Sequence, residues 1–180
     1  MLTTRCLPGG SAARRFLVGA IILAGASFGG SISARADDCA IILKAFEALA
    51  AAPAYSQSVT MKDSATLRFV VIGDVMYVND GSNWNKIPFK ASDRRNMLKQ
   101  LVPDDMHLKN CTRVGSEAID GAAMTVYSYV APVPKGMEAL VPANVVQKVW
   151  VGVSDGLPRR MTTDAVDMNI RFDGVTAPIP

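Results

Sequence analysis

The chain has 180 residues, of which 49% are hydrophobic, and its 19 basic and 16 acidic residues give a formal net charge of +3. The first 36 residues hold four of the arginines and no carboxylate, so the remaining 144 residues carry 15 basic and 16 acidic groups, a net charge of −1. A near-neutral domain has no electrostatic preference for nucleic acid, which excludes that class of partner.

The N-terminal segment has the pattern of a secretory signal peptide. Arginines precede an apolar run over 16–28, and small residues lead to Ala34-Arg35-Ala36, a cleavage pattern of the A-x-A type. The run is too short for a comfortable membrane span, although an uncleaved anchor helix is the alternative. The sequence therefore predicts a signal peptide over 1–36, one domain over 37–180, and a periplasmic or secreted protein with no stable membrane span.

Two cysteines remain once Cys6 leaves with the leader. Cys39 and Cys111 are an even count in an oxidising compartment, which predicts one disulfide. Such a link is worth about 4 kcal/mol in the chain-entropy description of a loop of this length. Lipid modification of Cys39 is disfavoured because Asp38 precedes it, and a metal site would need more sulfur or histidine nearby.

The first predicted element of the mature chain is an amphipathic helix over 39–51, which Pro53 ends. Its apolar stripe consists of Ile42, Phe46 and Leu49. A second helix is predicted over 91–103, with Ser92 as its cap. Its apolar ridge consists of Met97, Leu98 and Leu101.

Elsewhere the apolar period is two, which is typical of strands. The predicted strands are 56–63, 65–73, 75–80, 84–89, 107–120, 123–132, 145–153, 157–165 and 166–175. Hairpin-length turns such as Gly73-Asp74 separate them. We expect an α+β fold, in which a curved antiparallel sheet of about eight or more strands, an incomplete β-barrel, is covered by two or three helices.

The stretch VWVGVSDGLPRRM over 149–161 is predicted to be a hairpin. Trp150 would lie on one face and Val149 on the other, with a turn at Ser154-Asp155-Gly156. The two arginines 159 and 160 would point to opposite faces and form no single clamp, and a solvated strand edge is the expected place for them.

Residues for catalysis are sparse. His107 is the only histidine, both mature cysteines are expected to be oxidised, and Asp104-Asp105 suits a solvated turn. Gly-rich phosphate loops and metal-ligand spacings are missing. We therefore expect no catalytic residues, no metal site and no cofactor, and we note eight methionines after Met1 that could fill an adaptable apolar interior.

Three segments carry a resemblance to a known family. They are YVNDGSNWNKIP (77–88), VWVGVSDGLPRRMTTDA (149–165) and RFDGVTAPIP (171–180). With the order of elements around them, they resemble the periplasmic lipoprotein-carrier superfamily of LolA/LolB-like fold, which includes outer-membrane lipoprotein-sorting proteins. The resemblance implies a hydrophobic cavity for acyl chains between an incomplete β-barrel and its helices. Arg68 is the strand arginine that could correspond to the gating arginine of those carriers.

The expected function is that of an exported, non-enzymatic carrier that holds a lipid, a lipoprotein acyl chain or another apolar ligand. The side chains expected to face the cavity are Ile42, Phe46, Leu49, Phe69, Val71, Tyr77, Met97, Leu101, Met124, Val126 and Val149. The alternative is a non-catalytic envelope or secreted module with a filled core, which binds envelope proteins through a sheet edge or an aromatic patch. A hydrolase would need a Ser/His or carboxylate cluster that the spacing does not suggest.

Overall fold

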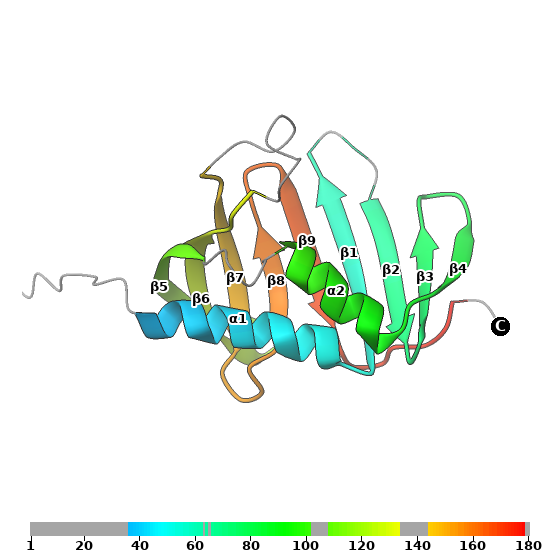
Figure 1. Ribbon diagram of the computed structural model, residues 1–180, viewed down its shortest axis with the longest axis horizontal. Helices are drawn as coiled ribbons and strands as arrows, with labels where there is room; N and C mark the ends of the chain where they lie inside the picture. The colour runs from blue at the N-terminus through cyan, green and yellow to red at the C-terminus, as the bar shows by residue number, and fades with distance from the viewer. Residues whose placement is uncertain (1–35, 63, 65, 102–107, 134–143, 179–180) are drawn as a thin grey trace, which may run out of the picture. The chain divides into compact units, whose positions relative to one another are not determined.

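The computed structural model describes residues 36–62, 64, 66–101, 108–133 and 144–178 (Figure 1). The helices within these residues are α1 (Ala36–Ala51) and α2 (Ala91–Leu101). The strands are β1 (Ala54–Met61), β2 (Thr66–Ile72), β3 (Val75–Asn79), β4 (Trp84–Pro88), β5 (Lys109–Ile119), β6 (Ala122–Val130), β7 (Val146–Gly152), β8 (Pro158–Thr162) and β9 (Val166–Arg171). The predicted α+β class and curved antiparallel sheet are confirmed. The predicted leader, apart from Ala36, lies outside the described residues.

All nine strands belong to one open sheet in the order β4-β3-β2-β1-β9-β8-β7-β6-β5. Strands β1 to β4 step outward to one edge, and the segment that contains α2 leads to β5 at the opposite edge. The chain then steps back from β5 to β9, which pairs with β1. Every pairing is antiparallel. This topology leaves one long sheet face beneath both helices (Figure 1).

Helix α1 packs its apolar stripe against β5 to β8, as its sequence period predicts. Ile42, Ala45 and Phe46 are buried between the helix and the sheet. Lys44 and Glu47, which lie outside the stripe, are exposed. The helix therefore covers the half of the sheet that is built from the second part of the chain.

The N-terminal end of α1 is fixed to the edge strand β5. Cys39 and Cys111 form the predicted disulfide, with 5.2 Å between their Cα atoms. One residue earlier, the Asp38 carboxylate accepts a hydrogen bond of 3.1 Å from the backbone N–H of Arg113. A covalent bond and a charge-assisted hydrogen bond thus attach the first turn of α1 to the same strand.

Helix α2 begins with a different cap from the predicted one. The Asp93 carboxylate accepts a 2.8 Å hydrogen bond from the backbone N–H of Lys90, which is the back-reaching half of a capping box. Ser92 lies within the first turn, and its hydroxyl bonds the same carboxylate at 3.4 Å. The cap prediction on Ser92 is therefore wrong, because the carboxylate three residues after Lys90 reaches the free amide.

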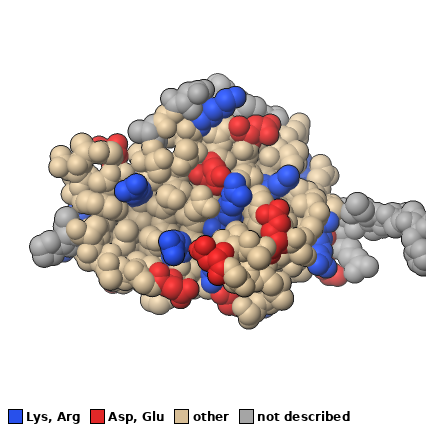
Figure 2. Space-filling view, turned by 180° about the vertical axis from the view of Figure 1, so that it is seen from behind, with Lys and Arg blue, Asp and Glu red and all other residues tan. Residues whose placement is uncertain are grey.

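The opposite face of the sheet carries charged side chains of both signs (Figure 2). Trp150 donates from its indole nitrogen to Glu117 at 2.8 Å, and the Arg160 guanidinium lies 5.0 Å from the centre of the Trp150 ring. Arg160 also makes a two-pronged contact with Asp167 at 2.6 and 3.1 Å. The hydrogen bonds with Asp167 raise the pKa of Arg160. The contacts link β5, β7, β8 and β9 on the face away from the helices.

The two arginines of β8 point to opposite faces, as predicted, but the strand is not an edge. It lies between β7 and β9 inside the sheet. Arg159 pairs with Asp155 at 2.6 Å and lies 4.6 Å from the centre of the Phe172 ring, while Arg160 makes the contacts described above. The expectation of a solvated edge was wrong because strand order depends on long-range pairing, which local sequence does not report.

We predict that the disulfide contributes about 4 kcal/mol to the free energy of unfolding, because it closes a loop between residues 72 positions apart. The paired change Cys39→Ala and Cys111→Ala should lower the urea midpoint accordingly, with the urea dependence measured by circular dichroism. Adding reductant should lower the midpoint of the wild type and leave that of the double variant unchanged. Two reactive thiols in the denatured, unreduced wild type would contradict this prediction.

Candidate ligand-binding cavity

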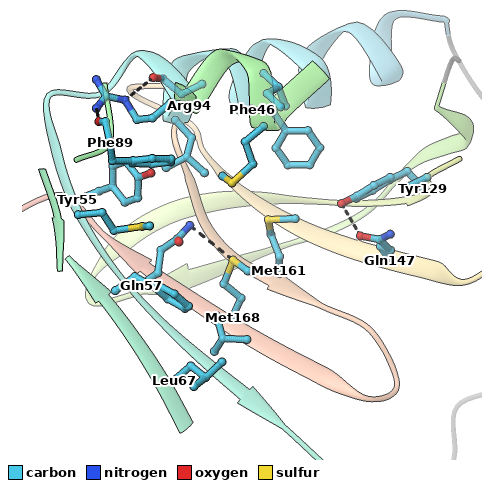
Figure 3. A pocket seen from close by; sticks show the side chains of 18 of the residues that line it. Phe46, Tyr55, Gln57, Leu67, Phe89, Arg94, Tyr129, Gln147, Met161 and Met168 are labelled. Atoms are coloured by element: carbon cyan, nitrogen blue, oxygen red, sulfur yellow. Dashed lines mark hydrogen bonds between the residues drawn. The ribbon is translucent and has the colours of Figure 1, made fainter. Parts of the chain in front are cut away.

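A cavity of about 610 Å³ lies between the helices and the sheet face beneath them (Figure 3). Its size falls within the usual range for small-molecule sites, about 300–1,000 Å³. The residues that line it are Phe46, Leu49, Ala50, Tyr55, Gln57, Val59, Leu67, Phe69, Met76, Phe89, Arg94, Met97, Leu98, Tyr129, Ala131, Pro132, Val133, Val145, Gln147, Met161 and Met168. Both helices contribute to the wall, and so do strands from both halves of the sheet order.

The wall is mostly aromatic, aliphatic and thioether in character. Four methionines line it, and a methionine side chain adapts its shape to a neighbour at little energetic cost. These are Met76, Met97, Met161 and Met168. In Figure 3 the labelled Met161 and Met168 lie close together in the wall opposite the helices. Such a surface suits an apolar ligand of variable shape.

Alternation along the strands explains why this wall is apolar. On β1, Tyr55, Gln57 and Val59 point to the same side, and the register with β2 places Leu67 beside Val59 and Phe69 beside Gln57. Each inward position thus lies next to another inward position. A one-residue slip of either strand would move its whole set to the other face.

At the α2 side of the cavity, a buried arginine connects the helix to neighbouring segments. Arg94 is 5% exposed, and its Nε donates to the carbonyl of Ala50 in the last turn of α1 at 3.0 Å. Its Nη1 donates to the carbonyls of Gly73 at 2.7 Å and Phe89 at 3.2 Å. Burial raises the pKa of the nearby Tyr55, and the charge of Arg94 acts in the opposite direction. One guanidinium thus joins α2 to α1, to the β2–β3 turn and to the residue after β4.

Of the eleven residues expected at the cavity, four line it. They are Phe46, Leu49, Phe69 and Met97. The side chain of Leu101 lies outside the described part of the chain, as do His107 and Asp104-Asp105.

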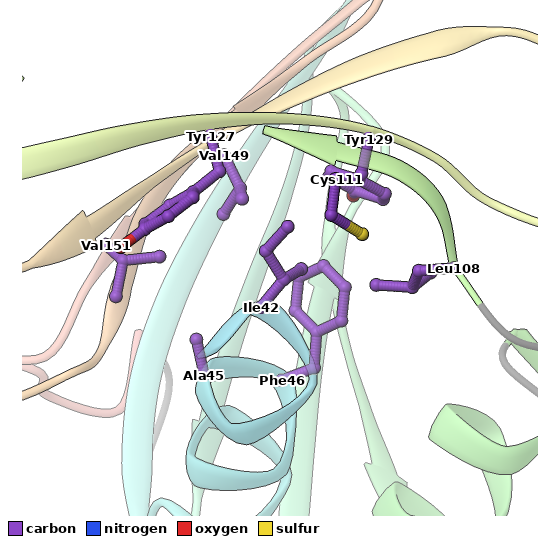
Figure 4. Close-up of a cluster of buried hydrophobic side chains, with 9 residues drawn as sticks. All are labelled: Ile42, Ala45, Phe46, Leu108, Cys111, Tyr127, Tyr129, Val149 and Val151. Atoms are coloured by element: carbon purple, nitrogen blue, oxygen red, sulfur yellow. The ribbon is translucent and has the colours of Figure 1, made fainter. Parts of the chain in front are cut away.

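Three of the expected residues lie on the helix-facing side but within packed core. Ile42 and Val149 belong to a cluster between α1 and the sheet (Figure 4). Val71 belongs to a second cluster with Tyr55, Phe89 and Ile170. All three are fully buried in the packed core and do not line the cavity.

Three others face away from the helices. Met124 and Val126 pack with Trp150 on the outer face, and Tyr77 lies in register with Lys86, whose Nζ is 5.9 Å from the ring centre. The predicted faces of β3 and β6 are therefore inverted. Both faces of these strands carry large apolar side chains, so the alternation alone did not indicate which face meets the helices.

Several lining residues were not singled out from the sequence. The clearest are Tyr55, Met76, Tyr129, Met161 and Met168. The abundance of methionine was a signal for an adaptable interior, but it did not identify which methionines share a wall. Arg94 carried no signal, because its partners are backbone carbonyls from three separate segments.

Comparisons with known proteins identify a solved structure of the same fold, but no protein that matches in sequence. No family model matches the sequence, and no curated protein matches it. The crystal structure of the Mycobacterium tuberculosis lipoprotein LppX is similar over 80% of this chain and 97% of that chain, with a TM-score of 0.51 at 14% identity. The chain has the fold of LppX. The structure of LprF from Mycobacterium bovis gives a TM-score of 0.48 at 14% identity, over 80% of this chain and 95% of that chain.

The resemblance expected from the sequence is thus confirmed at the level of fold. One detail differs from the expectation, because Arg68 is exposed and is next to Leu67 and Phe69 on β2, whose side chains line the cavity. Neighbouring side chains on a strand point to opposite faces, so Arg68 faces away from the cavity. The guanidinium of Arg94, in contrast, lines the cavity and donates a hydrogen bond to the carbonyl of Ala50 in α1.

We predict that Arg94→Met lowers the free energy of unfolding by about 3 kcal/mol, because it leaves buried carbonyls without a donor. The matched control is Arg95→Met, since Arg95 is the exposed neighbour on the same helix. That change should stay within about 0.5 kcal/mol of the wild type. Urea unfolding measures both, and equal stability of the two variants would argue against the role of Arg94.

Proposed function

We propose that this chain is an exported binding or carrier protein that holds an apolar ligand, a lipid or an acyl chain, in the cavity beneath α2. The observation that carries the proposal is the cavity itself: about 610 Å³, walled mainly by aromatic, aliphatic and methionine side chains. The shared fold with a mycobacterial lipoprotein is consistent with an envelope location.

The energetics of such a wall favour long apolar ligands. Each methylene moved from water to an apolar wall contributes about 0.8 kcal/mol, and association costs several kcal/mol in lost freedom. A ligand therefore needs several buried methylenes before binding becomes measurable. The flexible methionine side chains in the wall can adjust to ligand chains of different length.

The wall offers contact area and a few hydrogen bonds, which suits holding a ligand without converting it. Its one arginine is engaged with backbone carbonyls, and the cysteines are joined in the disulfide away from the cavity. The alternative, an interaction module with a filled core, is disfavoured because the cavity leaves the interior incompletely filled.

Export is the second part of the proposal. The leader over 1–36 has the order of a signal peptide, and the disulfide suits an oxidising compartment. Neither of the described helices is both long and apolar enough to cross a membrane. The carrier would then work in the periplasm or outside the cell.

Filling the cavity should abolish binding of an uncharged apolar probe. We predict that Met161→Trp weakens the binding of Nile red at least about tenfold, because the indole occupies the middle of the wall where the ligand would lie. Fluorescence titration of the exported, purified protein measures this affinity. Methyl laurate should displace the dye from the wild type.

The matched control is Val153→Trp, which places the same side chain at a position that is 66% exposed. It should bind the dye as the wild type does, and circular dichroism should show both variants folded. Failure of the wild type to bind Nile red, or equal binding by the folded Met161→Trp variant, would overturn the proposal.

A further inference from the structure

Two glutamines stand at inward strand positions of a mostly apolar wall. Gln57 is on β1 between Tyr55 and Val59, and Gln147 is on β7 two residues before the buried Val149. Alternation along each strand would favour an apolar side chain at both positions. An amide on an inward face indicates a specific role more strongly than an apolar residue there, because burying an amide without a hydrogen-bond partner costs free energy.

Gln57 has little hydrogen bonding within the protein. Its cross-strand neighbours are Phe69 on β2 and Ile170 on β9, whose side chains can neither accept nor donate a hydrogen bond. Its Nε2 donates to the Met168 sulfur at 3.7 Å, and a thioether is a weak acceptor. Among the described residues, nothing donates to the Oε1 of Gln57, so a carbonyl oxygen in the wall is left for a ligand donor or water.

Gln147 is oriented by a buried tyrosine. The Tyr129 hydroxyl donates to Oε1 of Gln147 at 2.9 Å, and the two residues are directly opposite each other on β6 and β7. Burial raises the pKa of Tyr129, so its hydroxyl stays protonated and keeps donating at neutral pH. Among the described residues, nothing accepts a hydrogen bond from Nε2 of Gln147, which leaves an amide donor for a ligand carbonyl.

The distribution of charge around the cavity also favours an uncharged ligand. Of the described residues that line it, Arg94 is the only one with a formal charge, and its Nε and Nη1 already donate to three backbone carbonyls. An ionised carboxylate that entered this wall would lose its water, and the guanidinium that could replace that water already has two of its three nitrogens bonded to backbone carbonyls. Uncharged ester or hydroxyl groups would lose less hydration free energy than a carboxylate, and they could form hydrogen bonds with the amides of Gln57 and Gln147.

We propose that Gln57 and Gln147 select ligands whose apolar chains carry uncharged hydrogen-bonding groups, such as esters or hydroxyls, over plain hydrocarbons and ionised fatty acids. The inference rests on the proposed function and specifies the ligand class of the same cavity. Gln147 supplies a donor to a ligand carbonyl, and Gln57 supplies an acceptor to a ligand hydroxyl.

The test compares three probes of similar length by displacement of Nile red: methyl laurate, tridecane and laurate at pH 8. A neutral hydrogen bond is worth roughly two- to tenfold in binding. The wild type should therefore bind methyl laurate about tenfold more tightly than tridecane, and more tightly than laurate. Glycerol monolaurate, which adds hydroxyls, should bind more tightly than methyl laurate.

The double variant Gln57→Leu and Gln147→Leu should bind tridecane at least as well as the wild type and reduce the ester preference to within about twofold. Gln57→Met with Gln147→Met, which keeps the length of both side chains, is the second pair in case the leucines disturb folding. The control is Asn169→Leu, which removes an exposed amide from β9 and should leave every ratio unchanged.

An unchanged ester-to-hydrocarbon ratio in the double variants would overturn the selection while leaving the carrier function intact. Tighter binding of laurate than of methyl laurate would also overturn it, since that order would assign the ligand head to the Arg94 guanidinium. No displacement by any probe, together with no dye binding by the wild type, would overturn the carrier function and this inference with it.

Discussion

The arrangement of the helices depends on one buried guanidinium. Helix α1 has no basic residue in its last turn, where a cation favours the free carbonyls of a helix end. Arg94 supplies that cation from α2 through its bond to Ala50, and the same side chain bonds Gly73 and Phe89. Because three separate segments share one donor group, the distance between the helices and this side of the sheet is fixed at a single point.

The other end of α1 is held by the Cys39–Cys111 disulfide, so the helix is attached to the sheet at both ends. Below it lie two packed clusters, one with β5 to β8 and one around Tyr55, Val71 and Ile170. Met161 contacts both clusters, and the cavity lies where they do not meet. An unfilled cavity costs stability, and a ligand that fills it restores the lost contacts. Binding should therefore also stabilise the fold.

Local sequence was enough to predict the elements but not their long-range placement. The apolar periods of 39–51 and 91–103 predicted the helices, the alternation of the strands predicted the antiparallel sheet, and the even count of cysteines after residue 36 predicted the disulfide. The faces of β3 and β6 were inverted because Tyr77 and Met124 lie in strands that are apolar on both sides. Arg94 was missed, and the strand edge expected for Arg159 was wrong. In both cases the partners of the side chain come from segments that only the fold brings together. Four cavity residues were nevertheless placed from helix and strand periods alone.

Native mass spectrometry of the protein purified after export tests the central claim most directly, because it asks whether the cavity is occupied in the cell. We expect part of the population to carry an adduct with the mass of a lipid or another apolar molecule, which organic extraction releases and identifies. The same adduct should be much reduced in Met161→Trp and retained in Val153→Trp. A mass equal to that of the bare polypeptide in every preparation, with no uptake of added methyl laurate, would contradict the claim that this cavity holds an apolar ligand.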